Sequence, residues 1–216
     1  MLTRLSENRI WFPSTELAEE DGLLAFGGDL SAERLLLAYS NGIFPWYSEA
    51  DPILWYAPRK RFVLFPQKLK ISASMIKVLN SGKFKVTYDQ DFAQIIQSCA
   101  TIKRTKQEGT WITAEMMSAY IALHELGHAH SVEVWENNLL VGGLYGVQIN
   151  QVFCGESMFS RVSNASKAAL IYLCQKLDFK MIDCQVYTQH LESMGAEFIS
   201  SDEYLNVLQS KKKSDF

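Results

Sequence analysis

The fold is decided by residues 130–159, which read HSVEVWENNLLVGGLYGVQINQVFCGESMF. The stretch holds three apolar, strand-like segments, and the first two meet at Asn137-Asn138. Paired asparagines tolerate the left-handed backbone that a tight hairpin turn requires. We therefore predict three consecutive antiparallel strands in this stretch.

Helical and strand-like segments surround these three strands. Before them, residues 113–127 predict a helix that begins at the cap Thr113 and ends at Gly127. The whole order predicts an α+β domain with a GNAT-like acyltransferase fold, in which a mostly antiparallel mixed sheet is flanked by helices. The elements predicted after the three strands are a helix at 164–179, a strand at 181–187, a short helix at 188–195 and a strand at 196–200.

The first 60 residues are rich in turn signals and predict a smaller unit. Ser31 is a candidate cap for a helix at 32–40, and Gly42 follows its end. The stretches FPW and DPILWYAPRKR predict extended chain, because proline disfavours helix in the residue before it. We place a small N-terminal domain at 1–60, which contributes aromatic residues to a cleft, and a GNAT-like catalytic domain at 61–216.

The catalytic domain is predicted to begin with mixed elements. We expect a charged loop at 103–110 and a solvated tail at 211–216. The elements predicted between residues 60 and 102 are a strand from about residue 61, a helix at 72–82, a strand at 83–89 and a helix at 91–102.

Composition indicates a globular protein of the cytoplasm. The chain of 216 residues is 48% hydrophobic and 21% charged, which is ordinary for a soluble domain. No apolar run approaches the roughly 20 residues that cross a bilayer, and the N-terminus has no signal-peptide pattern. The four cysteines show no C-x-x-C pairing, so we expect buried free thiols in a reducing compartment.

Charge is unevenly distributed along the chain. The net charge is −3, but residues 59–106 hold 11 Lys and Arg against two acids, Asp89 and Asp91, a local charge of +9. Solvated faces of strands and helices explain such a block, and so does a surface that binds the phosphates of a polyanion. The residues expected to contact such phosphates are Arg59, Lys60, Arg61, Lys68, Lys70, Lys77, Lys83 and Lys85.

The segment HELGHAH, residues 124–130, matches the zinc pattern H-E-x-x-H. That pattern needs both histidines inside one helix, and a third ligand. Gly127 is expected to end the helix before His128, and no further histidine occurs until His190. We therefore predict no metal site, with a zinc hydrolase kept as a minor alternative.

Three further stretches carry polar groups suited to chemistry. The loop Arg161–Ser166 has the spacing of a coenzyme A pyrophosphate loop but lacks its glycines, so it predicts no acetyl-CoA site and is otherwise an ordinary helix cap by Ser163 or Asn164. Glu156 lies in an apolar strand, where a carboxylate is costly unless paired. Asp183 and Gln185 alternate along one strand and are expected to share a face.

Nine segments occur in an order that resembles one family, the leucyl/phenylalanyl-tRNA–protein transferases, from about residue 10 to residue 205. They are GLLAFGGDL, GIFPWY, DPILWYAP, EGTWIT, LHELGHAHSVEVW, VGGLYGV, FCGESMFS, NASKAAL and IDCQV.

The resemblance implies an enzyme that moves leucine or phenylalanine, with methionine as a further candidate, from aminoacyl-tRNA to a protein. The donors would be Leu-tRNA and Phe-tRNA, and the acceptor would be the α-amino group of a protein that begins with Arg or Lys. The added residue would mark that protein for degradation. The resemblance implies no metal and no cofactor, since the tRNA ester is already activated, and we expect a monomer.

The resemblance also implies roles for single residues. Trp46 and Trp111 would hold the 3′-terminal adenosine by stacking. The aminoacyl pocket would include Leu144, Met158, Leu173 and Ile182. Some family members carry Met at the first of these positions and Phe at the third, where this chain has Leu.

The resemblance places Asp183 and Gln185 at the reacting centre. We interpret Gln185 as a hydrogen-bonding group that positions the amine and is itself oriented by Asp183, because a neutral amide is too weak a base. Glu156 and Asp183 would suit a cationic acceptor. A non-catalytic RNA-binding module and a coenzyme A acyltransferase stay open as other readings.

Overall fold

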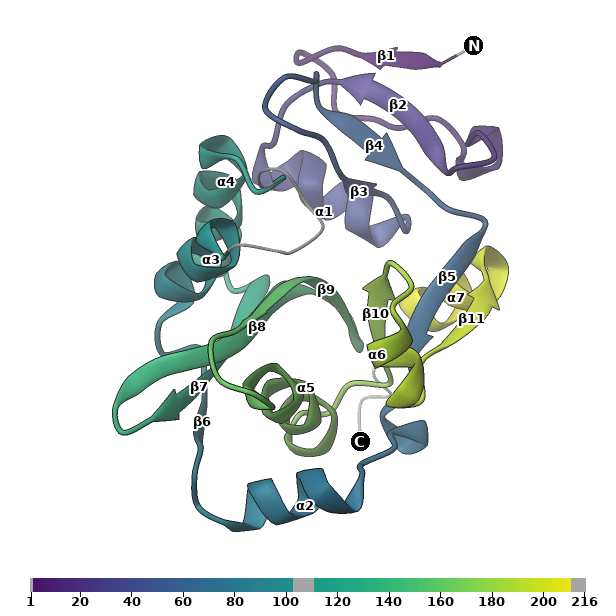
Figure 1. The fold of residues 1–216 in the computed structure, drawn as a ribbon. Helices are drawn as coiled ribbons and strands as arrows, with labels where there is room; N and C mark the ends of the chain where they lie inside the picture. The colour runs from purple at the N-terminus through teal and green to yellow at the C-terminus, as the bar shows by residue number, and fades with distance from the viewer. Residues whose placement is uncertain (1, 103–110, 211–216) are drawn as a thin grey trace, which may run out of the picture.

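The computed structural model describes residues 2–102 and 111–210 (Figure 1). Three basic residues of the charged block, Lys103, Arg104 and Lys106, lie outside the described residues. So do the loop expected at 103–110 and the tail expected at 211–216. No helix of the described part is long and apolar enough to cross a membrane.

The described chain alternates short strands and helices. The strands are β1 Thr3–Leu5, β2 Leu23–Gly27, β3 Phe44–Pro45, β4 Leu54–Tyr56, β5 Lys60–Leu64, β6 Lys85–Tyr88, β7 Ala129–Glu136, β8 Leu139–Ile149, β9 Val152–Ser160, β10 Met181–Gln185 and β11 Glu197–Ser200. The helices are α1 Ala32–Ser40, α2 Ala73–Asn80, α3 Phe92–Thr101, α4 Ala114–Glu125, α5 Ala165–Lys176, α6 Gln189–Ser193 and α7 Ser201–Gln209, with two 3-10 turns at Thr15–Leu17 and Pro66–Lys68.

Two sheets organise these elements. A four-stranded sheet has the order β1-β2-β4-β3, and a seven-stranded sheet has the order β11-β5-β10-β9-β8-β7-β6. In the larger sheet only β9 and β10 are parallel neighbours, and every other pair is antiparallel. The predicted α+β class, with a mostly antiparallel mixed sheet flanked by helices, is confirmed. The division at residue 60 stays a prediction.

Local signals fix the ends of several elements as the sequence predicts. Ser31 caps α1 by accepting a hydrogen bond from the Arg34 backbone N–H, and Thr113 caps α4 in the same way. Asn137 and Asn138 both have positive φ, 52° and 63°, as a tight hairpin turn between β7 and β8 requires.

Helix α7 was not predicted, although it carries a signal. Ser200 accepts a hydrogen bond from the Glu203 backbone N–H, and the spacing S-x-x-E is that of a capping box. The helix buries Tyr204 and Leu208 against the sheet. It matters for the site, because Tyr204 reaches one of the predicted catalytic residues.

Helices cover both faces of the larger sheet, which explains why β8 is buried along nearly its whole length (Figure 1). Helices α5 and α3 each contact β7, β8 and β9, while α4 contacts β7 and α1 contacts β8. The glycines of β8 allow this close packing. A Cβ atom at Gly142 would lie 2.5 Å from the Ala165 Cβ of α5.

Strands β9 and β10 pair over a short length and then separate. The two strands are paired only from Val152 to Cys154 and from Met181 to Asp183. Beyond these residues β9 stays with β8, while β10 stays with β5. The two halves of the sheet separate at this point, and the residues that follow in each strand face a common space.

We expect Gly143→Ala to lower the free energy of unfolding by about 1–3 kcal/mol, because overpacking strains a close-packed core. An added Cβ would overlap Ile95 Cδ1 and lie 2.5 Å from the Val132 carbonyl oxygen. Chemical denaturation measures the change. Leu139→Ala, on the same strand but 69% exposed, is the control and should change stability by less than about 0.5 kcal/mol. Equal stability of the Gly143 variant and the wild type would contradict the packing argument.

Candidate functional site

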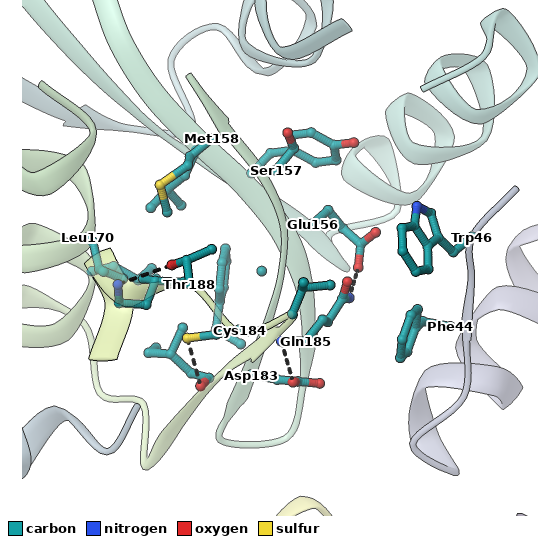
Figure 2. Close-up of a pocket in the computed structure, with 18 of the residues that line it drawn as sticks. Phe44, Trp46, Glu156, Ser157, Met158, Leu170, Asp183, Cys184, Gln185 and Thr188 are labelled. Carbon is teal, nitrogen blue, oxygen red and sulfur yellow. Dashed lines mark hydrogen bonds between the residues drawn. The ribbon is translucent and has the colours of Figure 1, made fainter. Parts of the chain in front are cut away.

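A cavity of about 430 Å³ lies where the two halves of the larger sheet separate. Its walls come from β8, β9, α5, β10 and α6, and from β3 of the smaller sheet with the residue that follows it. Figure 2 shows Phe44 and Trp46 on one side of this space, and Met158 and Leu170 on the opposite side. Between them, Glu156 and Gln185 are joined by a hydrogen bond.

The structure brings together all nine residues that the sequence assigns to catalysis, the adenosine and the aminoacyl group. Each of them lines this cavity, although they come from segments far apart in the chain. They are Trp46, Trp111, Leu144, Glu156, Met158, Leu173, Ile182, Asp183 and Gln185.

One end of the cavity is apolar. The four predicted pocket residues are joined there by Phe153, Leu170 and Leu191, which sequence reasoning missed. Leu170 precedes Leu173 by one turn of α5, so helical spacing could have indicated it. Such a lining suits a large apolar side chain.

Aromatic side chains form another wall. Trp46 is 43% exposed, and its ring lies 5.8 Å from that of Tyr56 in a tilted arrangement. The Trp46 backbone N–H donates to the Leu54 carbonyl, which fixes the residue beside β4. Trp111 is half-buried and packs against the core. Phe44, two residues before Trp46, also lines the wall.

Glu156 stands at a β-bulge. Gly155 pairs with Gly146 and Ser157 pairs with Tyr145, so Glu156 is the extra residue of β9. A bulge redirects the side chain that it carries. The Glu156 carboxylate accepts hydrogen bonds from Gln185 Nε2 at 2.6 Å and from the Tyr120 hydroxyl at 3.1 Å. Burial raises the pKa of Glu156 to about 7, although hydrogen bonds from Tyr39, Gln185 and Tyr120 hold it down.

Gln185 has a strained backbone. Its φ is 56°, in the left-handed region, and the Val186 N–H donates to the Cys184 carbonyl at 2.6 Å, which makes a γ-turn centred on Gln185. The pairing of β10 with β5 shifts register at Cys184. A left-handed conformation costs a non-glycine residue about 1–2 kcal/mol. This turn directs the amide to Glu156.

Asp183 is fully buried, and it lines the same cavity as Gln185. Its carboxylate accepts hydrogen bonds from Arg61, from the Tyr204 hydroxyl at 2.9 Å and from the Gln185 backbone N–H at 3.0 Å. The register shift between Asp183 and Gln185 breaks the simple alternation, so their side chains meet different partners. Asp183 therefore holds the turn that contains Gln185, and its carboxylate forms an ion pair with Arg61.

The prediction for Arg61 is wrong. The sequence assigns it to a phosphate-binding surface, but it is 3% exposed and forms a buried ion pair with Asp183. Its guanidinium also donates to the Gly42 carbonyl at 2.7 Å and lies over the rings of Phe44 and Tyr204. Residues 61–64 of β5 are all buried, so a charged residue in a basic run lies in the core.

The other predicted phosphate contacts are exposed. They extend from the start of β5 along α2 to β6, so they follow the rim of the larger sheet (Figure 1). Lys68 and Lys83 are paired with Glu197 and Glu136. The exposed residues are Arg59, Lys60, Lys68, Lys70, Lys77, Lys83 and Lys85.

The histidine segment has the predicted local structure. Helix α4 ends at Glu125, and Gly127 has a φ of 81°. His124 Nδ1 contacts the Ala129 carbonyl oxygen at 2.8 Å, and its ring stacks on Phe92. In the described part of the chain, no group of three or more His, Cys, Asp or Glu side chains is placed to hold a metal ion.

The loop before α5 differs from an ordinary cap. Asn164 occupies the cap position with a φ of 73°, but its side chain makes no capping hydrogen bond. The Ser166 backbone N–H instead donates to Ser160 Oγ at 3.3 Å. The Arg161 guanidinium donates to the Leu140 carbonyl and to Ser98 Oγ, so it is used in packing α3 and β8.

Comparison with known proteins finds relatives along almost the whole chain. The profile of a family described as Leucyl/phenylalanyl-tRNA protein transferase matches residues 63–209, and the profile of its N-terminal domain matches residues 28–59. A Leucyl/phenylalanyl-tRNA--protein transferase from Flavobacterium johnsoniae is 55% identical over 205 residues, 94% of this chain and 97% of the relative. One from Syntrophus aciditrophicus is 58% identical over 203 residues, 93% of this chain and 85% of the relative.

Solved structures of low sequence identity are also similar. A GCN5-related N-acetyltransferase from Kribbella flavida aligns over 72% of this chain and 56% of its own, with 9% identity and a TM-score of 0.36.

The raised pKa of Glu156 predicts a pH-dependent stability. Because the folded state binds this proton more tightly than the unfolded state, its contribution is present below about pH 4.5 and is lost as pH rises through about 7. Relative to Glu156→Gln, the wild type should lose about 1–3 kcal/mol of unfolding free energy between about pH 5 and pH 8. Denaturation at both pH values measures it, with Glu125→Gln at an exposed helix end as control. Parallel curves for wild type and Glu156→Gln would contradict it.

The buried ion pair predicts strong coupling between its partners. Arg61→Met or Asp183→Asn alone should lower the free energy of unfolding by about 3–5 kcal/mol, because each leaves one buried partner uncompensated. The double variant should lose less than the sum of the two. A double-mutant cycle by denaturation measures the coupling. Strictly additive losses would show that the two groups act independently.

Proposed function

Because the chain belongs to the leucyl/phenylalanyl-tRNA protein transferase family and is an aminoacyltransferase, we propose that it transfers leucine or phenylalanine from Leu-tRNA or Phe-tRNA to the N-terminus of a protein. The acceptor in this proposal begins with Arg or Lys, and the added residue makes it a substrate for proteolysis. Methionine is a further candidate donor, since it too is long and unbranched at Cβ.

One observation carries the proposal. A single cavity joins an apolar end, a wall of aromatic rings and a buried carboxylate that is hydrogen-bonded to an amide. The apolar end suits the side chain of the donor amino acid, the rings suit a nucleoside, and the carboxylate suits a cation. The ester carbonyl of the donor and the amine of the acceptor would meet where these three parts of the cavity adjoin.

The donor end is supported by the two tryptophans. Stacking of a base on an indole contributes about 1–3 kcal/mol and tolerates any base. Trp46 is exposed enough to receive a ring, and its contact with Tyr56 holds it in place. The exposed lysines and Arg59 along the rim of the larger sheet supply positive charge for the phosphates of the same tRNA.

The apolar end limits which amino acid is transferred. Met158, Leu170 and Leu173 leave a charged or amide side chain without a hydrogen-bond partner. One methylene changes binding in such a pocket by only about 1–3 kcal/mol, so two large apolar residues can share it. Side chains branched at Cβ would be rejected by their shape.

The acceptor end is supported by Glu156 and Gln185. An α-amino group has a pKa near 8, which leaves roughly a tenth of it neutral at pH 7. An aminoacyl ester is already activated, so positioning of that neutral amine contributes more than a strong base would. We assign the positioning to the Gln185 amide and the attraction of the cationic acceptor to Glu156. Asp183 acts indirectly, by holding the backbone of Gln185.

Two further points complete the proposal. Aminoacyl-tRNA is made in the cytoplasm, so we place the enzyme there. We also propose that it acts as a monomer.

The test is transfer of radiolabelled leucine from Leu-tRNA to an Arg-initiated peptide, with an Asp-initiated peptide as comparison. We expect labelled product only with the Arg peptide. When acetyl-CoA replaces Leu-tRNA as the donor, no modified peptide should form. Trp46→Ala should raise the KM for Leu-tRNA about tenfold or more, because one stacking platform is lost. The KM for the peptide should change little.

Leu126→Ala is the matched control, since it removes an apolar side chain that is 61% exposed and lies at the far end of α4, outside the cavity. It should leave both constants unchanged. Binding of tRNA without any labelled peptide would instead support the RNA-binding module, and transfer to both peptides alike would refute the acceptor assignment.

A further inference from the structure

Two buried tyrosines connect Glu156 to helices outside the cavity wall. Tyr120 of α4 donates its hydroxyl hydrogen to Glu156 Oε2 at 3.1 Å, and the hydroxyls of Tyr120 and Tyr39 lie 2.5 Å apart. Tyr39 belongs to α1, and neither tyrosine is more than 2% exposed. Neither lines the cavity. The two hydroxyls therefore approach the Glu156 carboxylate from the protein interior, on the side away from the cavity.

The rings of these tyrosines are held firmly. Tyr120 packs edge-on against Tyr39 and against Tyr145, with ring centres 6.5 Å and 5.8 Å away. A phenylalanine would fill the same space, so packing alone does not explain the two hydroxyls. A buried hydroxyl costs free energy unless it is hydrogen-bonded, and here each finds its partner in the other or in Glu156.

Glu156 needs this support because its backbone does not fix its side chain. The residue lies in the bulge of β9, outside regular pairing with β8. Gln185 engages Oε1 and Tyr120 engages Oε2, so both carboxylate oxygens have a donor. Only the donor on Oε1 stands in the cavity. The donor on Oε2 sets the rotation of the group.

From this geometry we propose that Tyr120, backed by Tyr39, is a positioning residue for acceptor binding, which fixes the Glu156 carboxylate to receive the cationic N-terminus of the acceptor. The inference rests on the proposed function. It makes acceptor recognition depend on the packing of α1 against α4, and thus of the N-terminal part of the chain against the larger sheet. Donor binding does not depend on it.

Titration of Glu156 provides a second readout. The groups that face this carboxylate are Tyr39 from α1, Tyr120 from α4, and Gln185 and Asp183 from β10. Burial raises the pKa of Glu156, the hydrogen bonds from Tyr39, Gln185 and Tyr120 lower it, and the Asp183 charge raises it. Loss of the Tyr120 hydroxyl should therefore move the pKa further upward.

The experiment measures the dissociation constant of an Arg-initiated peptide by calorimetry without donor, from about pH 5.5 to 7.5, where its amino group stays largely protonated. In the wild type, binding should tighten as pH rises through about 7, because Glu156 becomes ionised. In Tyr120→Phe, binding at pH 7 should weaken about tenfold, the value of one hydrogen bond to a charged group. The midpoint should shift to higher pH, while the KM for Leu-tRNA stays the same.

Two further variants keep the test decisive. Tyr39→Phe removes the other hydroxyl that lowers the pKa of Glu156 and should shift the midpoint in the same direction. Tyr88→Phe removes a half-buried hydroxyl on the remote edge strand β6 and should match the wild type.

The possible failures are distinguishable. Unchanged acceptor binding and pH midpoint in both Tyr120→Phe and Tyr39→Phe would overturn the positioning role. If the binding of donor and of acceptor weakened equally and the melting temperature fell, the tyrosines would serve folding alone. Failure of the wild type to bind the Arg peptide at any pH would refute the proposed acceptor itself.

Discussion

The structure of the site depends on the buried ion pair between Arg61 and Asp183. A charge this deep in the protein is tolerated only when its partners are complete. Arg61 meets this condition by also reaching the Gly42 carbonyl and the rings of Phe44 and Tyr204. One guanidinium thus joins the end of α1, strand β3, helix α7 and strand β10. The wall that carries the exposed indole is held against the wall that carries Gln185.

Irregular backbone places the polar groups of the cavity. Glu156 lies at the bulge of β9, and Gln185 lies at a γ-turn just beyond the register shift of β10. In regular strands these side chains would follow the alternation of their neighbours. The bulge and the turn instead direct them to each other at 2.6 Å. The Asp183 carboxylate, which accepts the Gln185 N–H, offsets the strain of the left-handed residue.

The two ends of the cavity offer different interactions, apolar packing at one end and a buried carboxylate at the other. The apolar end is lined mainly by apolar side chains, so the size and shape of a side chain decide whether it fits there. The polar end keeps a carboxylate whose pKa, raised to about 7 by burial, leaves it sensitive to a neighbouring cation. Because the same burial that raises this pKa strengthens its attraction for a cation, the cost of hiding the carboxylate is offset when a cationic partner arrives.

The sequence by itself determined the elements that local chemistry controls. Asn137-Asn138 set the hairpin, Thr113 and Gly127 set the ends of α4, and the order of the segments set the α+β class. It also identified nine residues that line one cavity, through their resemblance to a family. Only the tertiary structure decided that Arg61 lies inside, that Asp183 and Gln185 contact different partners, and that tyrosines support Glu156. These depend on pairing between strands distant in sequence, which no local periodicity encodes.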